Sequence, residues 1–231
     1  MNPQRTIVVT DYNFPDLALE TAVLAGSGCT LVGHHCNSEA ELIAAVAQAD
    51  AVITQFARIN AAVIGAMSRA RAIVRYGIGV DNVDLEAARA LGLPVSNIPD
   101  YCIDEVADHT LAFMLGLTRQ VVTHTSDLRA GQWRLAVPVT GMRALREQTV
   151  GIVGFGRIGR EVVARLQAFK CRVLVHDPVV PVADIAAAGA SAGSLEAVLA
   201  QSDILSLHCP SSAATRRLIR AETLAQMKPG A

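Results

Sequence analysis

The stretch Gly151-Ile-Val-Gly154-Phe-Gly156-Arg-Ile-Gly159-Arg160 decides the fold of the second half of the chain. The residues before it, 149–153, form a short apolar run of the kind found in buried strands. The residues after it, 157–170, carry apolar side chains at helical spacing. A strand, a glycine-rich turn and a helix in this order are typical of a Rossmann unit that binds a dinucleotide.

Each glycine of this motif has its own physical task. Gly154 permits the tight turn, Gly156 lets the backbone approach a pyrophosphate without a Cβ in between, and Gly159 lets the helix pack close to the strand. The phosphates would then lie against the N–H groups and the positive dipole end of the helix. The alternative is that these glycines only shape a turn.

An acidic residue follows the next expected strand. Residues 171–176 read as a strand that ends in Asp177, roughly the twenty residues after the glycine motif at which a dinucleotide-binding unit has its acid. The carboxylate would accept hydrogen bonds from ribose hydroxyls and repel a 2′-phosphate. The sequence therefore predicts NAD rather than NADP as the cofactor.

The composition of the 231-residue chain suits an α/β protein with parallel sheets. Hydrophobic residues make up 52% and aromatic residues 4%, as expected for aliphatic strands under Ala-rich helices. No apolar run reaches the roughly eighteen residues of a membrane span, and no signal-peptide pattern opens the sequence, so no membrane partner is expected. A net charge of −1 without a basic patch argues against a nucleic-acid partner.

The cysteines and histidines form no metal-binding pattern. The 5 cysteines are scattered without a Cys-x-x-Cys pair, and reduced thiols in a cytoplasmic protein are the simplest explanation. His34, His35 and Cys36 are adjacent, and adjacent residues of a strand point to opposite faces and do not chelate one ion together. We therefore expect no metal site.

The N-terminal part of the chain alternates between apolar strands and helical stretches. The expected strands are 6–10, 30–33, 51–54, 72–75 and 94–96, and the expected helices are 17–25, 39–48, 61–67 and 84–91. Repeated β-α units of this kind predict a parallel, flavodoxin-like domain over residues 1–100. Ligands of such sheets gather in the loops at the carboxyl ends of the strands.

A long helix is expected to connect this domain to the glycine motif. Its apolar pattern runs from Ile103 to about Thr125, and an irregular stretch through Trp133 and Pro138 follows. Charged residues such as Asp108 make the helix amphipathic, so it reads as a bridge between domains and not as a membrane span.

One loop at the carboxyl end of an expected strand has an unusual sequence, Arg75-Tyr-Gly77-Ile-Gly79-Val-Asp81-Asn82-Val-Asp84. The glycines on either side of Ile78 can expose consecutive N–H groups as an anion-binding nest for a substrate carboxylate. The alternative is a turn into a helix that is capped by Asp81, Asn82 or Asp84. Arg75 can contact a distal anionic group such as a phosphate, form a surface salt bridge, or be solvated at the end of the strand.

Several spaced motifs carry a resemblance to a known family. They are Arg75–Asp84, Gly92–Pro99, Glu105–Leu111, the glycine motif, Asp177-Pro178, Leu207–Pro210 and Met227–Gly230. On these motifs the chain resembles the D-isomer-specific 2-hydroxyacid dehydrogenase family. Residues 98–108 look like the branch that holds phosphoglycerate dehydrogenases and C-terminal-binding-protein-like members.

The resemblance implies a two-domain organisation. Residues 1–100 would form a flavodoxin-like substrate (catalytic) domain, and residues 101–231 a Rossmann NAD-binding domain that is incomplete at its C-terminus. The helix and arm at 103–140 would build a two-fold homodimer. The other expected partner is a small 2-hydroxy or 2-keto acid, and the expected cofactor is NAD.

Carried over residue by residue, the resemblance assigns contacts to positions of this sequence. The substrate carboxylate would be held by the loop Gly77, Ile78 and Gly79, with Arg75 as a further substrate-binding candidate. The cofactor would contact Ile78, Thr110, Gly154, Phe155, Gly156, Arg157, Ile158, Gly159, Asp177, His208, Cys209, Pro210 and Thr215. Within this set the glycine motif would hold the pyrophosphate, Asp177 the adenosine ribose, and Ile78 would lie near the nicotinamide.

The catalytic groups that the resemblance implies have no counterpart in this sequence. They are an Arg that binds and polarises the keto acid and a Glu–His pair that exchanges the proton, and all of them would lie beyond Ala231. The histidines present are not expected to replace them, because His109 and His124 lie on the bridging helix, His176 precedes the ribose acid and His208 ends a strand. No catalytic residue is assigned within the chain.

Together these patterns predict an NAD-dependent oxidoreductase that transfers hydride between NAD(H) and a small 2-hydroxy or 2-keto acid. The candidate acids are 3-phosphoglycerate and acids like hydroxypyruvate or glyoxylate. Two alternatives stay open: a non-catalytic, NAD-responsive binding module like the C-terminal-binding proteins, and a non-functional fragment. A chain without the catalytic segment is expected to bind the cofactor without turnover.

Overall fold

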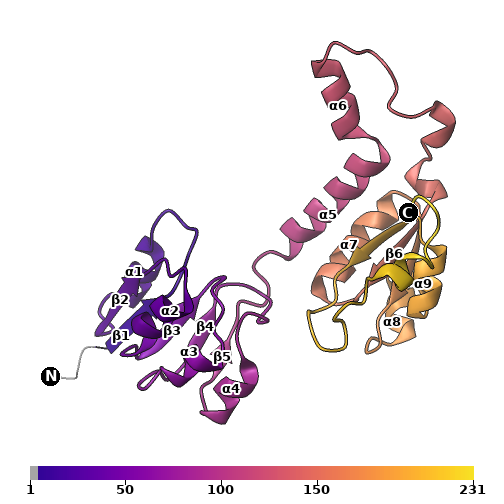
Figure 1. Cartoon of the computed structure of the whole chain (residues 1–231). Helices are drawn as coiled ribbons and strands as arrows, with labels where there is room; N and C mark the ends of the chain where they lie inside the picture. The colour runs from indigo at the N-terminus through magenta and orange to yellow at the C-terminus, as the bar shows by residue number, and fades with distance from the viewer. Residues whose placement is uncertain (1–4) are drawn as a thin grey trace. The chain divides into compact units, whose positions relative to one another are not determined.

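The computed structural model describes residues 5–231. The chain divides into two units, Met1–Tyr101 and Cys102–Ala231 (Figure 1). Each unit holds one parallel sheet with helices packed against it, which confirms the predicted α/β class.

The sheet of the first unit has five parallel strands in the order β2-β1-β3-β4-β5. They are β1 (Arg5–Val9), β2 (Cys29–Gly33), β3 (Ala51–Thr54), β4 (Ile73–Arg75) and β5 (Val95–Ser96). Every one coincides with a strand expected from the apolar pattern, with bounds that agree to within one residue. The order is that of a flavodoxin-like sheet.

An aligned row of aliphatic residues crosses this sheet. Val8, Val52, Ile73 and Val95 are register neighbours on successive strands. The helices of this unit are α1 (Ala18–Leu24), α2 (Glu39–Val46), α3 (Ala61–Gly65) and α4 (Leu85–Ala90). The row belongs to the core formed with α2, α3 and α4. Because side chains alternate along a strand, the opposite face carries the neighbouring residues, and α1 lies over it.

The sheet of the second unit has four parallel strands in the order β8-β7-β6-β9. They are β6 (Thr149–Val153), β7 (Arg172–His176), β8 (Ser191–Ala192) and β9 (Ile204–Leu207). Every residue of β6 is buried, whereas those of the edge strand β9 are half-buried or exposed. The glycine motif thus begins from the best-protected strand of its sheet.

Helices cover both faces of this second sheet. They are α5 (Ile103–Thr118), α6 (Val121–Arg129), α7 (Arg157–Ala168), α8 (Val182–Ala187), α9 (Leu195–Gln201) and α10 (Ala221–Leu224), with short 3-10 turns at Val139–Gly141 and Leu145–Glu147. Val150 and Ile152 pack with residues of α5, α7 and α8. Val153 packs on the opposite side with Val198 of α9. The alternation of the strand therefore places α5, α7 and α8 on one face of the sheet and α9 on the other.

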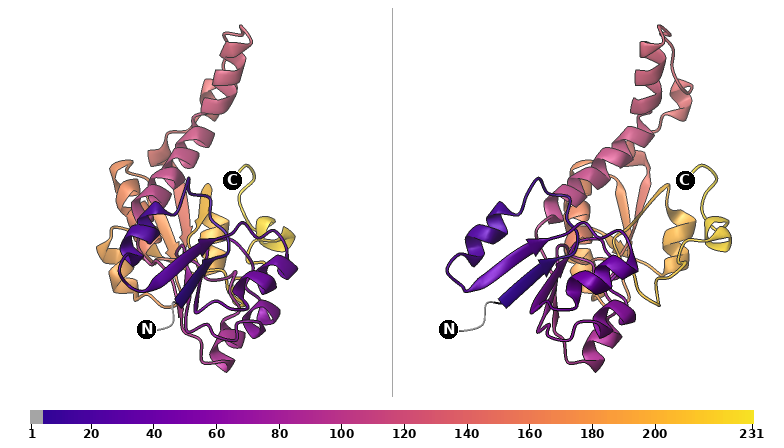
Figure 2. Two further views of the ribbon diagram at one scale, coloured as in Figure 1. Left: turned by 90° about the vertical axis from the view of Figure 1, so that its left-hand side faces the viewer. Right: turned by 60° about the vertical axis from the view of Figure 1, so that its left-hand side comes forward.

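The single long helix expected from Ile103 to about Thr125 is wrong. The structure has two helices, α5 and α6, which are separated at Gln120, where the backbone adopts a left-handed φ of 54°. The hydroxyl of Thr118 donates to the Met114 carbonyl at 2.7 Å, a local bond that competes with the helix ladder. In Figure 1 and in both views of Figure 2, α6 extends beyond the sheet of its own unit. Within residues 5–231, no helix has the length and apolar character of a membrane span.

Candidate cofactor site and substrate loop

Two glycines of the motif are required by close backbone packing. Gly154 has a left-handed φ of 97°, and a Cβ there would lie 2.5 Å from the backbone N of Cys209. A Cβ on Gly159 would collide with the carbonyl of Gly154. Gly156 differs, because a Cβ there would meet no heavy atom within 4 Å. The protein fills the space around two of the glycines and leaves the space beside the third open.

The turn places the start of α7 at this open space. The N–H of Gly154 donates to the His176 carbonyl at 2.8 Å, and the N–H of His208 donates to the Val153 carbonyl at 2.7 Å. Gly156 is the N-cap of α7, and no described side chain caps this helix end. The first turn of α7 can therefore offer its N–H groups and positive dipole end to an anionic ligand.

Asp177 fixes the glycine turn and the loop after β7 by accepting hydrogen bonds from three backbone N–H groups. Its Oδ2 accepts from Phe155 at 2.7 Å, and its Oδ1 accepts from Val179 at 2.9 Å and Val180 at 3.0 Å. Burial alone would raise the pKa of Asp177, but these bonds lower it below its usual range. The residue expected to bind the ribose is thus an anion that also fixes the glycine turn.

An arginine that the sequence motifs did not single out packs on the same turn. The guanidinium of Arg160 lies 4.5 Å from the centre of the buried Phe155 ring, a cation–π contact, and 3.8 Å from Asp184 of α8. The helical spacing puts Arg160 one turn after Gly156, but nothing in the sequence indicates that Phe155 turns inward. Arg160 therefore joins the turn to α8.

The loop after β9 forms the other side of the turn. The backbone of Cys209 lies so close to Gly154 that it leaves no space for a Cβ there. Within the loop, Thr215 donates its hydroxyl to the Pro210 carbonyl at 2.6 Å and accepts from the Ser212 N–H at 2.9 Å. Thr215 therefore closes its own loop, and a cofactor contact by Thr215 or Pro210 stays a prediction.

His208 is enclosed next to this loop. Burial lowers the pKa of His208, so the neutral form is favoured. One ring nitrogen, Nε2, lies 3.0 Å from the hydroxyl of Ser206. His208 thus has a structural partner, and its predicted contact with the cofactor is untested.

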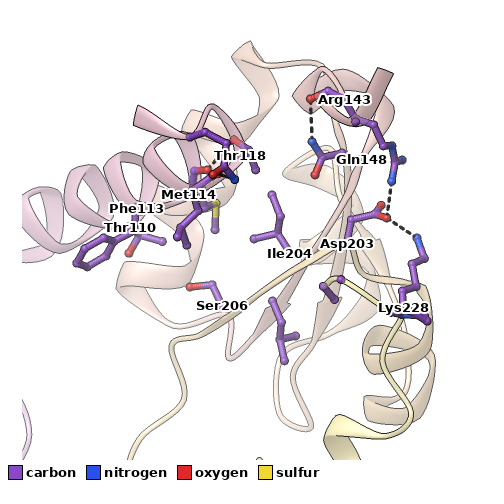
Figure 3. A pocket seen from close by; sticks show the side chains of 17 residues that line it. Thr110, Phe113, Met114, Thr118, Arg143, Gln148, Asp203, Ile204, Ser206 and Lys228 are labelled. Carbon is purple, nitrogen blue, oxygen red and sulfur yellow. Dashed lines mark hydrogen bonds and ion pairs between the residues drawn. The ribbon is translucent and has the colours of Figure 1, made fainter. Parts of the chain in front are cut away.

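A groove of about 920 Å³ lies along β9 and α5 within the second unit (Figure 3). Thr110 and Ser206 both line it, and the Thr110 hydroxyl donates to the Val106 carbonyl one helical turn earlier at 2.7 Å. At the far end of the groove, Asp203 pairs with Arg143 at 2.9 Å and with Lys228 at 3.0 Å. Thr110 is therefore bonded within its helix, and no geometry tests its predicted cofactor role.

The substrate loop of the first unit begins with Arg75 packed over Gly77. Gly77 has a φ of 150°, and a Cβ there would collide with the Arg75 guanidinium. The Nε of Arg75 is buried without a partner. Within residues 5–231 the Arg75 side chain forms no ion pair, so the surface salt bridge considered from the sequence is absent from the described part of the chain.

The remainder of this loop is held open by neighbouring backbone. The N–H of Ile98 donates to the Gly77 carbonyl at 3.1 Å, and the side-chain amide of Asn97 donates to the Ile78 carbonyl at 2.7 Å. Both carbonyls are thereby engaged in hydrogen bonds, and Gly79 is exposed. The cap considered as an alternative also exists, since Asp84 accepts from the N–H of Ala87 at 3.0 Å at the start of α4. The cap lies at the end of the loop, and the nest at Gly77–Gly79 stays a prediction.

Most of the remaining histidines have structural partners. Nδ1 of His176 lies 3.1 Å from the Gly193 carbonyl, and His124 accepts from the N–H of Ala136 at 3.1 Å. The rings of His35 and His109 pack on Tyr12 and Phe113. Among residues 5–231, no three His, Cys, Asp or Glu side chains gather as a metal site.

Comparisons with known proteins agree with this geometry. The family model described as D-isomer specific 2-hydroxyacid dehydrogenase, NAD binding domain, matches residues 111–231. The chain is 39% identical over 191 residues to a D-3-phosphoglycerate dehydrogenase of Mycobacterium leprae, an alignment that covers 82% of this chain and 36% of that protein. It is 32% identical over 191 residues to a hydroxypyruvate reductase of Thermotoga maritima, covering 82% of this chain and 61% of that protein.

A solved structure extends the similarity to both units. The chain superposes on D-lactate dehydrogenase from Aquifex aeolicus, complexed with NAD and lactic acid, with a TM-score of 0.87 and 26% identity. The match covers 96% of this chain and 66% of that one. The chain thus spans about a third of the mycobacterial relative and about three-fifths of the reductase. NAD as the cofactor of residues 111–231 agrees with the matched family model.

Proposed function

Because the chain belongs to the D-isomer specific 2-hydroxyacid dehydrogenase family, we propose that it acts with NAD(H) on a small 2-hydroxy or 2-keto acid. When bound, the cofactor supplies a hydride for C2 of the keto acid, and a proton from solution or a protein group completes the hydroxyl. The second unit holds the cofactor, and the loop 75–79 of the first unit holds the acid. The acid is thus assigned to the N-terminal unit and the cofactor to the C-terminal unit.

The observation that carries the proposal is the contrast within the glycine turn. Gly154 and Gly159 are packed against backbone, whereas Gly156 faces open space at an uncapped helix start. A turn that served only to reverse the chain would have no need for a glycine at the open position. A pyrophosphate explains it, because a Cβ there would keep the phosphates from the helix N–H groups.

The ionised Asp177 supports NAD over NADP. Its lowered pKa keeps the carboxylate charged, and a carboxylate repels the 2′-phosphate that distinguishes the two cofactors. Its three backbone bonds leave about one acceptor site for a ribose hydroxyl, since a carboxylate offers about four such sites.

For the acid, Arg75 and the nest form a complementary pair. A guanidinium with a buried, unpartnered Nε is costly unless an anion occupies the site. The N–H of Gly77 donates to the Arg75 carbonyl at 2.9 Å, so a substrate carboxylate would be bound through the N–H groups of Ile78 and Gly79 and would neutralise Arg75. The acids to compare are 3-phosphoglycerate, hydroxypyruvate and glyoxylate, with their keto or hydroxy counterparts.

The proposed macromolecular partner is a second copy of the chain. In α5, Leu111 and Met114 face the core of their own unit, whereas Phe113 and Leu117 are largely exposed. Trp133, beyond α6, is 91% exposed. Apolar surface along α5, α6 and the following arm favours an isologous contact. Light scattering of Leu117→Glu against the unchanged protein tests it, and a monomer in both would contradict the homodimer.

We also propose a reducing, cytoplasmic location. All five cysteines are unpaired, and Cys171 is buried with a pKa raised by that burial. Thiols that stay reduced suit a reducing compartment.

Cofactor titration tests the central proposal. We expect NADH to bind to the full chain and to quench or enhance its fluorescence, with NADPH binding at least about tenfold more weakly. Gly156→Val should abolish binding, whereas thermal unfolding should shift only slightly, because a Cβ there meets no heavy atom within 4 Å and the remaining cost is that of replacing Gly at the N-cap of α7. Equal affinities for the two cofactors, or binding that survives Gly156→Val, would overturn the proposal.

A further inference from the structure

The loops at the carboxyl edge of the first sheet are tied into one surface by Asp11. Its carboxylate accepts from the N–H groups of Gln55 at 3.1 Å, Phe56 at 2.6 Å and Ala57 at 3.1 Å. The hydroxyl of Thr54 also donates to it at 3.1 Å. The loop after β1 therefore fixes the loop after β3.

The substrate loop joins the same surface. The side-chain amide of Asn82 donates to the carbonyls of Gln55 and Ala57 at 3.4 and 3.0 Å. The rings of Phe14 and Tyr76 meet edge to face with their centres 5.5 Å apart. The loops after β1, β3 and β4 thus surround the glycines that are proposed to hold the carboxylate.

The aromatic residues of the first unit all lie at this edge. They are Tyr12 and Phe14 after β1, Phe56 after β3, Tyr76 after β4 and Tyr101 after β5. The core of the unit is aliphatic. Phe56 is 65% exposed although its N–H is firmly bonded to Asp11. Tyr76 turns to α1, where its hydroxyl donates to Glu20 at 2.9 Å. Phe56 is thus the exposed aromatic side chain at this edge whose backbone is fixed by Asp11, and it indicates an apolar contact surface there.

The charge at this edge opposes a second anionic group. The edge loops, 10–17, 34–38, 55–60, 76–84 and 97–101, carry the carboxylates Asp11, Asp16, Asp81, Asp84 and Asp100. Their Lys and Arg content is Arg58 alone, with His34 and His35 in addition, and Arg75 ends the adjoining strand. Burial would raise the pKa of Asp11, but its backbone and hydroxyl donors lower it, so it stays ionised. The positive charge of Arg75 balances one substrate carboxylate, but a phosphate dianion on the same substrate would remain unbalanced among these carboxylates.

From this placement we propose that the edge selects 2-keto acids whose C3 substituent is uncharged and apolar, aromatic above all, with Phe56 as the specificity-determining residue. This inference rests on the proposed function, because it assumes that the nest at Gly77–Gly79 holds the carboxylate. It narrows the substrate class away from phosphorylated acids. The acid would stack its substituent on the aromatic surface and leave the acidic loops undisturbed.

Four pyruvates that differ only at C3 test the proposal: pyruvate, hydroxypyruvate, phosphohydroxypyruvate and phenylpyruvate. Calorimetric titration of the full chain, saturated with NADH, measures each affinity without requiring turnover. We expect phenylpyruvate to bind at least about tenfold more tightly than hydroxypyruvate, and phosphohydroxypyruvate more weakly than hydroxypyruvate. Phosphohydroxypyruvate as the tightest ligand would overturn the inference.

Variants of Phe56 locate the preference. Phe56→Ala should weaken phenylpyruvate about tenfold and change pyruvate by less than about twofold. Phe56→Arg should reverse the order of phenylpyruvate and phosphohydroxypyruvate by adding the missing cation. Leu91→Ala is the matched control, because Leu91 is also an exposed apolar residue but ends α4, away from the carboxyl edge. An equal loss in Phe56→Ala and Leu91→Ala would overturn the role of Phe56.

The proposed function and this inference fail in different ways. If NADH binds but none of the four acids does, the acid site itself is wrong, and the specificity falls with it. If pyruvate binds and Arg75→Ala weakens it, the proposed function stands, and the order of the other three acids decides the inference alone.

Discussion

In each of the two units, one carboxylate fixes the loops at the carboxyl edge of the sheet. Asp11 in the first unit and Asp177 in the second both follow a strand and both accept from three backbone N–H groups of loops at the carboxyl edge. Asp11 receives hydroxyl donors as well, from Thr10 at 2.8 Å and Thr54 at 3.1 Å. Asp11 is therefore committed to its loops, whereas Asp177 keeps capacity for a ligand.

One confined glycine in each unit shows a related difference. A Cβ on Gly154 would meet the backbone of His208 and Cys209, whereas a Cβ on Gly77 would meet only the side chain of Arg75. The cofactor turn is thus rigid by construction. The substrate loop can adapt at the cost of one side-chain movement.

The largest expected effect separates glycines within the rigid turn. Gly154→Ala should destabilise the protein by more than about 3 kcal/mol, because it adds a clash with backbone to an unfavourable φ. Urea unfolding followed by circular dichroism measures this loss. Gly156→Ala is the control, with weaker NADH binding and a loss of stability of at most about 1 kcal/mol, the ordinary cost of Ala at a helix N-cap. Equal stability of the two variants would show that the turn is not rigid.

The second largest expected effect is that of Asp11→Asn, which should lower the free energy of unfolding by about 2 kcal/mol. An amide cannot replace an ionised carboxylate as the acceptor for the backbone N–H groups and hydroxyls that bond to Asp11. The lowered pKa of Asp11 also sets a pH dependence. Its stabilisation is complete above the unfolded-chain value of about 3.9 and is lost as the pH falls through the lower folded value.

Unfolding at pH values from 7 down to 2 checks both parts. The slope of stability against pH in the acid range should be shallower in Asp11→Asn than in the unchanged protein. Parallel curves would mean that Asp11 titrates alike in the folded and unfolded chain, contrary to its hydrogen bonding.

This pair of carboxylates also shows what sequence reasoning reaches. Asp177 was identifiable because a strand, a glycine turn and a fixed spacing lead to it. Asp11 was not, because its partners are backbone N–H groups some forty residues away along the chain, and backbone donors leave no signature in residue types. The strands were predictable because they appear as apolar runs. The break between α5 and α6 was not, because the apolar periodicity continues across Gln120, where only the backbone φ changes.

Asp177→Ala should have a smaller and different consequence. Removing the charge should narrow the preference for NADH over NADPH by about tenfold, equivalent to about 1.4 kcal/mol. It should also lower affinity for both cofactors, because the Phe155 N–H loses its acceptor. Asp184→Ala, which removes the carboxylate near Arg160 on the neighbouring helix, is the control and should leave the ratio of affinities unchanged. An unchanged ratio in Asp177→Ala would mean that the carboxylate serves the turn alone.

The smallest expected effect tests whether the substrate loop adapts through Arg75. Gly77→Ala should cost about 1–2 kcal/mol, from the strained φ and from displacement of the guanidinium. In an Arg75→Ala background the displacement is already absent, so the same substitution should cost about 1 kcal/mol less. A double-mutant cycle by urea unfolding measures that coupling. Strictly additive losses would place the whole cost in the backbone, and the two glycine loops would then be equally rigid despite their different neighbours.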